Sequence, residues 1–260
     1  MTKAETLYFK PVAAWRWLPW LLASQLLVAA VWWQCGWAWG LALMLATHAL
    51  FIVPVFLPNS RFYAPVVSAL EAPGVWLTID DGPGPQTPAV LELLARYDAK
   101  ATFFMVGERA AAAPELVRQV LEQGHSIGNH SHTHPQASFW RLGPAAMAGQ
   151  IGQAQQALGA IIGEPPRLYR SVVGMTNPFV APALNQHRLV RVGWSARGFD
   201  GVGCTPEQVL RRLAPGLVPG AIVLLHEGAA HGHNLAILEA VLQALQQRGL
   251  VARLPDVAKP

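Results

Sequence analysis

The segment from Trp17 to Leu57 contains no Asp, Glu, Lys or Arg, and this feature restricts the possible folds of the chain more than any other. It is too long for one membrane span but long enough for two of about 20 residues each. A break at Gln34-Cys35-Gly36 divides it, so the sequence predicts a helical hairpin with transmembrane helices at about 17–35 and 37–57. Side chains typical of the headgroup layer flank the break: Trp32, Trp33, Trp37 and Trp39.

The composition also indicates that part of the chain lies in lipid. Hydrophobic residues make up 52% of the chain and charged residues 13%, whereas soluble domains are about 25% charged. The net charge is +4, but the basic residues are scattered and form no Lys/Arg-rich run, so no nucleic acid partner is predicted. The two cysteines, Cys35 and Cys204, do not suggest a disulfide framework. A lipid bilayer is the expected partner of this basic chain.

Basic residues on both sides of the apolar segment predict its orientation. Lys3, Lys10 and Arg16 precede the first span and Arg61 follows the second. The positive-inside rule then puts both ends of the hairpin, and everything after Arg61, in the cytoplasm. We therefore expect a protein of a bacterial-type inner membrane with its catalytic domain on the cytoplasmic face. A cleaved signal peptide is the alternative, but the segment lacks a short apolar region followed by a small-residue cleavage site.

The change in composition after the apolar segment predicts three parts. Residues 1–60 form a membrane anchor, residues 61–74 a linker, and residues 75–260 a separate domain. The apolar part of the linker, residues 62–70, is interpreted either as a segment along the membrane surface that guides a headgroup or as a plain connection.

From Val75 onward, short apolar runs alternate with helical periodicity, which is typical of an α/β domain with parallel strands. About seven strand-helix units are expected, in a barrel or an open sheet, with reactive groups at the carboxyl ends of the strands. Strands are predicted at 75–79, 101–106, 125–128, 167–169, 189–194 and 221–225. Helices are predicted after an N-cap at Thr87 and at 114–123, 144–162, 206–213 and 235–248.

Two adjacent acids, Asp80 and Asp81, end the first of these strands in Thr78-Ile79-Asp80-Asp81-Gly82-Pro83. Neighbouring carboxylates repel each other, so the pair favours a bound cation. A metal would stabilise one carboxylate as a ligand and leave the other to accept a proton from water. The alternative is a polar turn, because Asp-Gly-Pro is also good turn chemistry.

Three histidines follow another predicted strand, in His130-Ser131-His132-Thr133-His134. His130 and His134 are four apart and would face the same way on one helical turn, which suits two ligands of one zinc ion. His132 would point elsewhere. With Asp81, the set offers two nitrogens and one oxygen and leaves positions open for water and substrate. The alternative is a solvated histidine-rich loop.

Further candidate residues stand at later strand ends. The apolar run from Ala221 to Leu225 stops on His226, which is placed for proton transfer. A histidine packed at a strand end is the alternative interpretation. Arg170 and Trp194 also stand at predicted strand ends, and Asp200 lies in the loop after Trp194.

These motifs resemble the polysaccharide deacetylase family, also called the NodB-homology or carbohydrate esterase 4 family. The family's Thr-Phe-Asp-Asp-Gly-Pro is matched by residues 78–83 with Ile79 for Phe, and its His-Ser/Thr-x-x-His by residues 130–134. Its terminal Leu-x-His is matched at residues 224–226. Its Arg-Pro-Pro-Tyr-Gly is matched only at Arg170 and Gly174, and its Asp-rich fourth motif is replaced by residues 194–200.

The resemblance covers about residues 75–254 and implies a distorted (β/α)7 barrel that follows the transmembrane hairpin. It implies that Asp80 is the general base, that Arg170 orients it, and that His226 is the general acid. It implies one divalent metal, for which two imidazoles and a carboxylate favour zinc, held by Asp81, His130 and His134. The backbone N–H of Val173, which replaces the family's Tyr, is expected to bind the oxyanion. Substrate contacts are assigned to Trp194 and Asp200.

The predicted function is removal of an N-acyl group, N-acetyl above all, from an amino sugar of a polysaccharide or of a lipid-linked glycan. A cytoplasmic domain tied to the bilayer favours the lipid-linked substrate, because a secreted polymer would be out of reach. Two alternatives stay open. One is a non-catalytic carbohydrate-binding membrane protein with altered third and fourth motifs, and the other is an O-deacetylase or deformylase with the same site.

Overall fold

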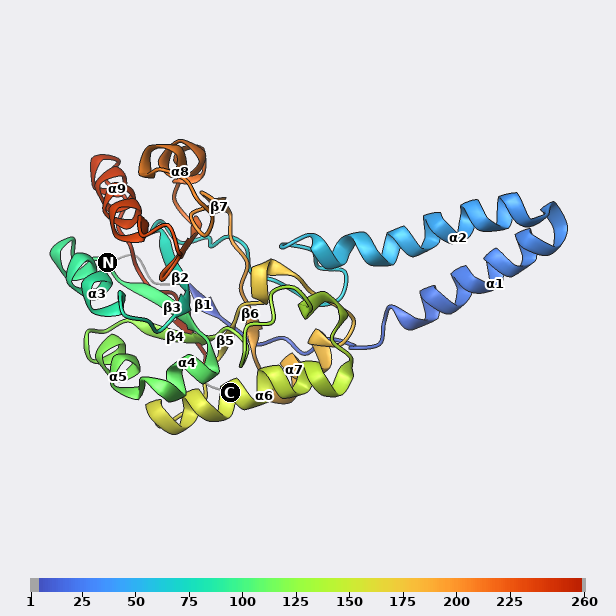
Figure 1. The fold of residues 1–260 in the computed structure, drawn as a ribbon, viewed down its shortest axis with the longest axis horizontal. Coiled ribbons are helices and arrows are strands. Elements are labelled where there is room, and N and C mark those ends of the chain that lie inside the picture. Colours follow the sequence, from blue (N-terminus) through green and yellow to red (C-terminus); the bar gives the residue numbers. More distant parts are fainter. Residues whose placement is uncertain (1–4, 259–260) are drawn as a thin grey trace.

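The computed structural model describes residues 5–258 and consists of a compact domain from which a helical hairpin projects (Figure 1). Lys3 and the last two residues of the predicted domain lie outside the described part. The hairpin comprises α1 (Leu18–Cys35) and α2 (Trp37–Ile52), and the 3-10 turn η1 (Val53–Phe56) continues α2. Gly36 joins the helices with φ 88°, a left-handed value that glycine adopts without strain. By length and composition, α1 and the continuous helix formed by α2 and η1 are candidate membrane spans.

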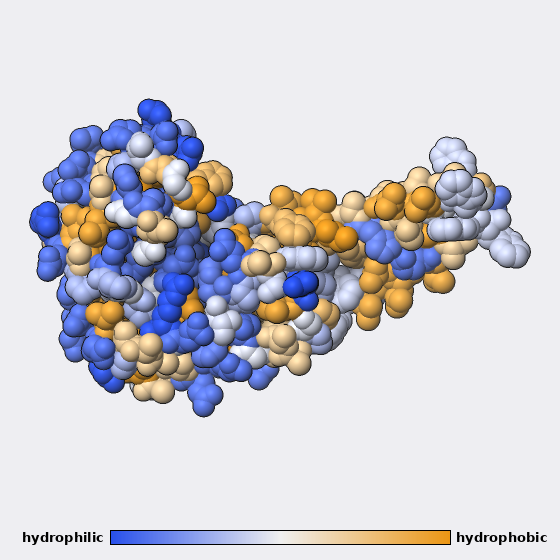
Figure 2. Space-filling view, in the orientation of Figure 1, coloured by the Kyte–Doolittle hydropathy of each residue, from blue (hydrophilic) through white to orange (hydrophobic). Residues whose placement is uncertain are grey.

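The hairpin exposes its apolar side chains almost completely. Only 6% of the first candidate span and 17% of the second is buried inside the molecule. Figure 2 shows hydrophobic residues along the hairpin and a mostly hydrophilic domain surface. A helix that is apolar on all sides is typical of a protein core or a membrane span, and this pair is not buried in the domain.

The domain is built on a seven-stranded sheet in which all neighbouring strands are parallel. The strand order is β6-β5-β4-β3-β2-β8-β7, so the sheet curls without closing, in agreement with the expected distorted barrel. The strands are β2 (Trp76–Gly82), β3 (Ala101–Met105), β4 (Ser126–Asn129), β5 (Leu168–Tyr169), β6 (Val190–Arg191), β7 (Ala196–Arg197) and β8 (Ile222–His226).

Helices cover the outside of this sheet (Figure 1). They are α3 (Thr87–Arg96), α4 (Gly107–Ala112), α5 (Pro114–Glu122), α6 (Pro144–Ile162), α7 (Val180–His187), α8 (Pro206–Leu213) and α9 (Asn234–Gln247). Short 3-10 turns are η2 (Phe139–Arg141), η3 (Val172–Gly174) and η4 (Ala214–Gly216). The sequence did not predict α4, α7 or β7.

The prediction that Thr87 caps α3 is wrong. Thr87 is the first residue of the helix, and its N-cap is Gln86, which makes no side-chain capping bond. The Thr87 hydroxyl is used elsewhere: it accepts a hydrogen bond from the Gly84 N–H and donates one to Glu227.

Alternation along β2 divides its side chains between two layers of the core. Leu77 and Ile79 pack into the cluster beneath the outer helices. Trp76 belongs to the inner cluster with Phe104 and Leu224. Thr78 and Asp80 continue the inner face, so the strand aims Asp80 into the barrel.

Segments outside the expected domain boundaries also pack onto the domain. The short strand β1 (Thr6–Leu7) pairs with β9 (Asp256–Val257), and Leu7 is buried in the inner cluster. Tyr63 and Ala64, within the predicted linker, are 3% and 0% exposed, and Val67 bridges to Val192. Tyr63, Ala64 and Val66 of the 62–70 segment are therefore buried in the domain, whereas Phe62 is exposed.

Candidate active site

A bulge at the end of β2 brings both acids to one place. In a regular strand, side chains alternate, so Asp80 and Asp81 would point to opposite faces. The pairing with β3 is irregular between Asp80 and Gly82, and Asp81 has φ 73°. A bulge of this kind re-aims a side chain, and it allows both carboxylates to line the same pocket.

Arg170, which follows β5, fixes the orientation of Asp80. Its guanidinium is fully buried and donates to Asp80 Oδ1 at 2.8 Å and to Thr78 Oγ1 at 2.7 Å. It also donates to the Gly193 carbonyl at 2.7 Å, and it lies 4.3 Å from the centre of the Phe104 ring. A charge-assisted pair held by this many contacts has one geometry, so Asp80 is positioned rigidly.

His130 and His134 converge on Asp81, although the predicted helical turn is wrong. Residues 130–135 form an irregular loop, in which Ser131 and His134 have φ values of 68° and 52°. The two ring centres are 5.0 Å apart. Asp81 Oδ1 lies 3.5 Å from His130 Nε2 and 3.1 Å from His134 Nε2.

Three ligand atoms, one each from Asp81, His130 and His134, lie within 4.8 Å of one another and can hold a metal ion. Asp81 Oδ1 is buried and has no hydrogen-bond partner among the described residues, as expected of an oxygen that serves a cation. His130 Nδ1 donates to the Arg170 carbonyl at 2.9 Å, which leaves Nε2 as the ligand atom. His132 is not part of this group.

The electrostatics of Asp81 and His134 fit ligation. Burial opposes a charged His130 imidazole, but the charges of Asp80 and Asp81 outweigh it and raise the pKa of His130 in the absence of a cation. Burial disfavours the charged form of Asp81, but the neighbouring imidazoles of His130 and His134 outweigh it and hold the pKa of Asp81 well below its usual range. Burial and the charge of His130 lower the pKa of His134 to about 4. An ionised carboxylate and a neutral imidazole are the forms that bind metal ions.

His226 lines the same pocket and is paired with the buried Asp200. His226 stands in register with Asp80 on the neighbouring strand β8. Its Nδ1–H donates to Asp200 Oδ1 at 3.0 Å, and its backbone N–H donates to Asp200 Oδ2 at 2.7 Å. Burial opposes a charged imidazole, but the hydrogen bond and charge of Asp200 raise the pKa of His226 to about 9.

These contacts give Asp200 a position that the sequence did not predict. Its side chain is only 1% exposed and lies against His226 rather than at the pocket surface, where a substrate contact would be made. It does not reach Arg170. The partnership depends on a loop meeting a strand 26 residues later, and sequence spacing alone carries no information on such a contact.

The carboxylates and imidazoles line a small pocket of about 90 Å³. Val173 lies in its wall with φ 45° and ψ 23°, a left-handed conformation that is strained for a β-branched residue. Trp194, for which the sequence predicts a substrate contact, also lines the pocket. Arg197 lines it too, beside Trp194, and the sequence interpretation missed it. A pocket of this size suits a small group such as an acyl substituent.

Comparisons with known proteins agree with this arrangement. The family model described as polysaccharide deacetylase matches residues 68–192. A chitooligosaccharide deacetylase from Bradyrhizobium is 33% identical over 187 residues, which cover 71% of this chain and 84% of the relative. A peptidoglycan-N-acetylglucosamine deacetylase from Listeria monocytogenes is also 33% identical, over 75% of this chain and 40% of its own length.

A solved structure shows the same architecture. The family 4 carbohydrate esterase from Streptomyces lividans, in complex with acetate, is 32% identical and superimposes with a TM-score of 0.64. The match covers 70% of this chain and 93% of the esterase. By sequence and by fold, this chain belongs to the polysaccharide deacetylase family.

Proposed function

We propose that this chain is a metal-dependent hydrolase that removes an N-acetyl group from an amino sugar. The observation that carries the proposal is the placement of Asp80 and His226, in register on neighbouring strands, beside the group formed by Asp81, His130 and His134. Binding a sugar needs no such combination of a positioned carboxylate, a charged imidazole and three potential ligands. The relatives named as N-acetylglucosamine and chitooligosaccharide deacetylases support the acyl group and the sugar.

We assign one divalent cation, zinc, to Asp81, His130 and His134. Tetrahedral zinc with bonds of about 2.0–2.2 Å separates its ligands by roughly 3.3–3.6 Å, close to the 3.1 and 3.5 Å between Asp81 Oδ1 and the two imidazole nitrogens. Such a cation, when bound, supplies Lewis acidity for the acyl carbonyl and for the attacking water.

The chain's own groups then move the protons. Asp80, held by Arg170, accepts a proton from the attacking water, and the Val173 backbone N–H donates to the developing oxyanion. His226, kept protonated by Asp200, donates its proton to the departing nitrogen, since an amine leaves poorly without it. Trp194 forms an apolar wall for the sugar beside these groups.

We further propose that the hairpin is a retained membrane anchor in an inner membrane, with the domain on the cytoplasmic face. The pairing of β1 with β9 supports retention, because cleavage after the hairpin would remove a strand of the folded molecule. The same pairing supports a topology in which both ends of the hairpin lie on one side of the bilayer. The basic residues beside the spans support the cytoplasmic side.

The test is the release of acetate from tri-N-acetylchitotriose by the full chain in detergent with zinc. His226→Ala should lower kcat on the order of a hundredfold or more, because the leaving nitrogen loses its acid. His233→Ala, an exposed histidine in the same segment, is the matched control and should retain wild-type turnover. Near wild-type turnover of His226→Ala refutes the assignment of the acid.

The product also separates the alternatives. Acetate from an N-acetylated sugar supports N-deacetylation, acetate from only O-acetylated sugars supports an O-deacetylase, and formate from formylated sugars supports a deformylase. Sugar binding without release of any acid by the zinc-loaded wild type would identify a non-catalytic carbohydrate-binding protein.

A further inference from the structure

Pro58 and Asn59, which follow the hairpin, pack directly against the wall of the catalytic pocket. Asn59 donates to the Trp194 carbonyl at 2.7 Å, and its Oδ1 accepts from the Trp194 N–H at 3.4 Å. A Cβ added to Gly174, which lines the pocket, would lie 2.7 Å from Pro58. Buried Arg191 donates to the Pro58 carbonyl at 2.8 Å. These contacts restrict rotation of the hairpin relative to the domain, so the pocket lies at a fixed distance from the hairpin.

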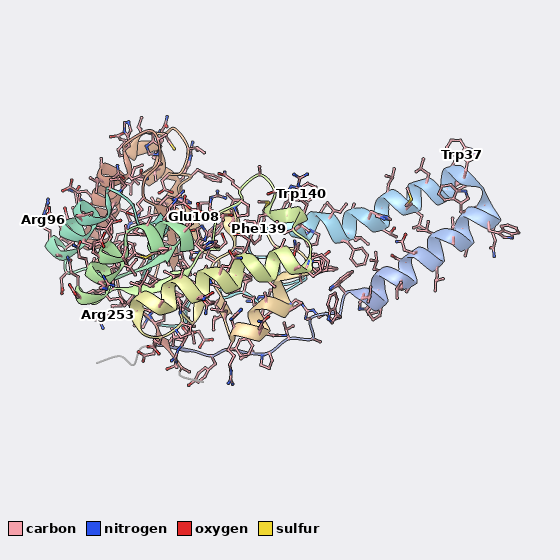
Figure 3. The ribbon with its side chains drawn as sticks, turned by 60° about the horizontal axis from the view of Figure 1, so that its bottom comes forward. Trp37, Arg96, Glu108, Phe139, Trp140 and Arg253 are labelled. Carbon is pink, nitrogen blue, oxygen red and sulfur yellow. The ribbon has the colours of Figure 1, made fainter. Side chains whose placement is uncertain are left out.

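Aromatic side chains surround the hairpin where it meets the domain, and we call them the aromatic collar: Trp15, Trp17, Phe56, Phe62, Trp140 and Phe179. The ring centres of Phe56 and Trp140 are 5.9 Å apart, and those of Trp15 and Phe179 are 6.2 Å apart. Trp140 and Phe179 belong to the domain, and Figure 3 shows Trp140 at the foot of α2. The collar therefore contains residues of both the anchor and the domain, in contact with one another.

The collar is one of two aromatic belts on the molecule. The other lies at the far tip, where Trp33 and Trp37 are 90% and 69% exposed and Trp37 marks the end of the hairpin in Figure 3. The helix between the belts has 18 residues, or about 27 Å at 1.5 Å per residue, close to the roughly 30 Å of a bilayer core. Tryptophan favours the headgroup level on both sides of the core. The helix is no longer than the bilayer core, so the domain lies directly against the lipid.

We propose that the aromatic collar seats the domain in the headgroup layer, so that the catalytic pocket opens beside the membrane surface and takes an amino sugar carried by a membrane lipid. The bilayer is the occupant of the collar because this surface continues directly into the membrane-spanning helices. The headgroup layer is roughly 5–8 Å thick on each side, and the pocket wall touches Pro58 and Asn59 at the end of the span. The inference rests on the proposed deacetylation and names the class of its substrate.

The experiment compares two substrates in one preparation. Full-chain protein is reconstituted in phosphatidylethanolamine and phosphatidylglycerol vesicles, and acetate is measured from polyprenyl-diphosphate-linked N-acetylglucosamine in the vesicles and from soluble tri-N-acetylchitotriose. Trp140→Glu places a charge in the collar, and Val251→Glu is the matched control. The two side chains are similarly exposed, 43% and 48%, but Val251 follows α9, away from the collar.

We expect Trp140→Glu to lower turnover of the lipid-linked sugar at least about tenfold, while turnover of the soluble sugar changes less than twofold. Val251→Glu should change neither. An equal loss on both substrates, or no loss on either, overturns the collar proposal. Absence of acetate from both substrates with the zinc-loaded wild type would instead count against the proposed deacetylation, so the two failures can be told apart.

A second inference comes from Arg197, whose charge the mechanism does not use. Its guanidinium lies 4.4 Å from the ring centre of Phe199 and 5.3 Å from that of Trp194, and it lines the catalytic pocket. Its Nε is buried and has no hydrogen-bond partner within residues 5–258. The two nearest acids are already engaged, Asp80 by Arg170 and Asp200 by His226.

We infer that Arg197 is a specificity-determining residue that binds an anionic group next to the acylated sugar. A guanidinium packed against two aromatic rings keeps N–H groups free for an anion, and its planar fork suits the oxygens of a phosphate or a carboxylate. The sugar phosphate of a lipid carrier and the carboxylate of an acidic sugar share this chemistry.

Competition experiments test Arg197 without requiring that the probe be cleaved. Inhibition of chitotriose hydrolysis is measured with N-acetylglucosamine 1-phosphate, N-acetylmuramic acid and the neutral methyl glycoside of N-acetylglucosamine. The wild type should bind one anionic sugar about tenfold more tightly than the neutral one, Arg197→Gln should lose this preference, and Arg197→Lys should keep part of it. The anionic sugar that is preferred identifies the source. Equal inhibition by all three with the wild type, or an unchanged preference in Arg197→Gln, overturns the inference.

Discussion

The hairpin and the carboxyl edge of the sheet break the usual distribution of side chains in opposite ways. The hairpin exposes large apolar residues, such as Leu26 at 73%, whereas the sheet edge buries charged ones, such as Arg170 at 0% and Asp80 at 3%. Either arrangement costs free energy in a soluble protein without a ligand. Each fits the partner proposed above, lipid for the hairpin and a cation with its substrate for the sheet edge. Changes at one region should leave the other intact.

The largest effect is expected from removing a predicted metal ligand. His130→Ala should lower zinc affinity and reduce turnover by about a thousandfold, because a Lewis acid contributes several kcal/mol to such a reaction. Bound zinc is measured by elemental analysis, and acetate release is measured alongside. Membrane association should be unchanged, which separates the two regions. A variant that keeps a full equivalent of zinc at unchanged affinity would show that the ligand set is wrong.

The next largest effect is expected from a charge in the hairpin. Leu26→Arg introduces a cation near the middle of α1, which costs about 2.5–3.5 kcal/mol in membrane insertion. The share of the protein in the membrane fraction should fall strongly, while kcat on soluble chitotriose in detergent stays within twofold. Leu26→Val serves as the control. Loss of detergent-phase turnover in Leu26→Arg would mean that the hairpin is part of the catalytic domain.

A smaller effect is expected from neutralising the buried acid Glu227. Burial raises its pKa to about 7, so between its ordinary value of 4.5 and 7 the folded state binds more protons than the unfolded state. The contribution of Glu227 to the free energy of unfolding is therefore largest below pH 4.5, and it is lost as the pH rises through 7. In metal-free protein, Glu227→Gln should remove this decline and be more stable than wild type at pH 8 by on the order of 2 kcal/mol.

Urea titrations at pH 5 and pH 8 measure this difference. Thr205→Ala, which removes the capping box of α8 far from the acid, should lower stability by about 1 kcal/mol equally at both pH values. The same pH dependence in Glu227→Gln and wild type would contradict the buried-acid explanation.

The smallest effect is a displaced pH profile. Asp200 raises the pKa of His226 to about 9, and the proposed acid must be protonated to act. Asp200→Asn removes the charge, so the pKa of His226 falls and the alkaline decline of kcat should move to lower pH by at least about one unit, equivalent to 1.4 kcal/mol. Profiles of kcat from pH 6 to pH 10 measure the shift. An unmoved alkaline limb would exclude His226 as the titrating acid.

Local pattern predicted most of the fold. The prediction of α6 from Pro144 to Ile162 is confirmed residue for residue, and α1 lies within its predicted range. Both helices lack charges, but α6 repeats buried residues at helical spacing whereas α1 is apolar on every side. That difference in periodicity, visible in the sequence, separates a core helix from a membrane helix. The short elements α4, α7 and β7 were missed because so few residues carry little periodicity.

The sequence also located the ends of the strands but not the conformations that shape the site. The bulge at Asp81 and the left-handed backbone of Ser131, His134 and Val173 place non-glycine residues where propensity disfavours them. The surrounding contacts hold them there, and those contacts join distant segments. The pairing of Asp200 with His226 is of the same kind, so it was not predicted.

The pairing of Thr6 with Asp256 also orders events during biosynthesis. The two residues are separated by nearly the whole chain, and at about 5–20 residues per second β9 emerges from the ribosome roughly 10–50 s after β1. The hairpin lies between them and leaves the ribosome long before β9, so it is available for insertion while β1 still lacks its partner. The pairing of β1 with β9 is then among the last contacts to form. If the hairpin is the proposed membrane anchor, this pairing forms on a chain that already lies beside the bilayer.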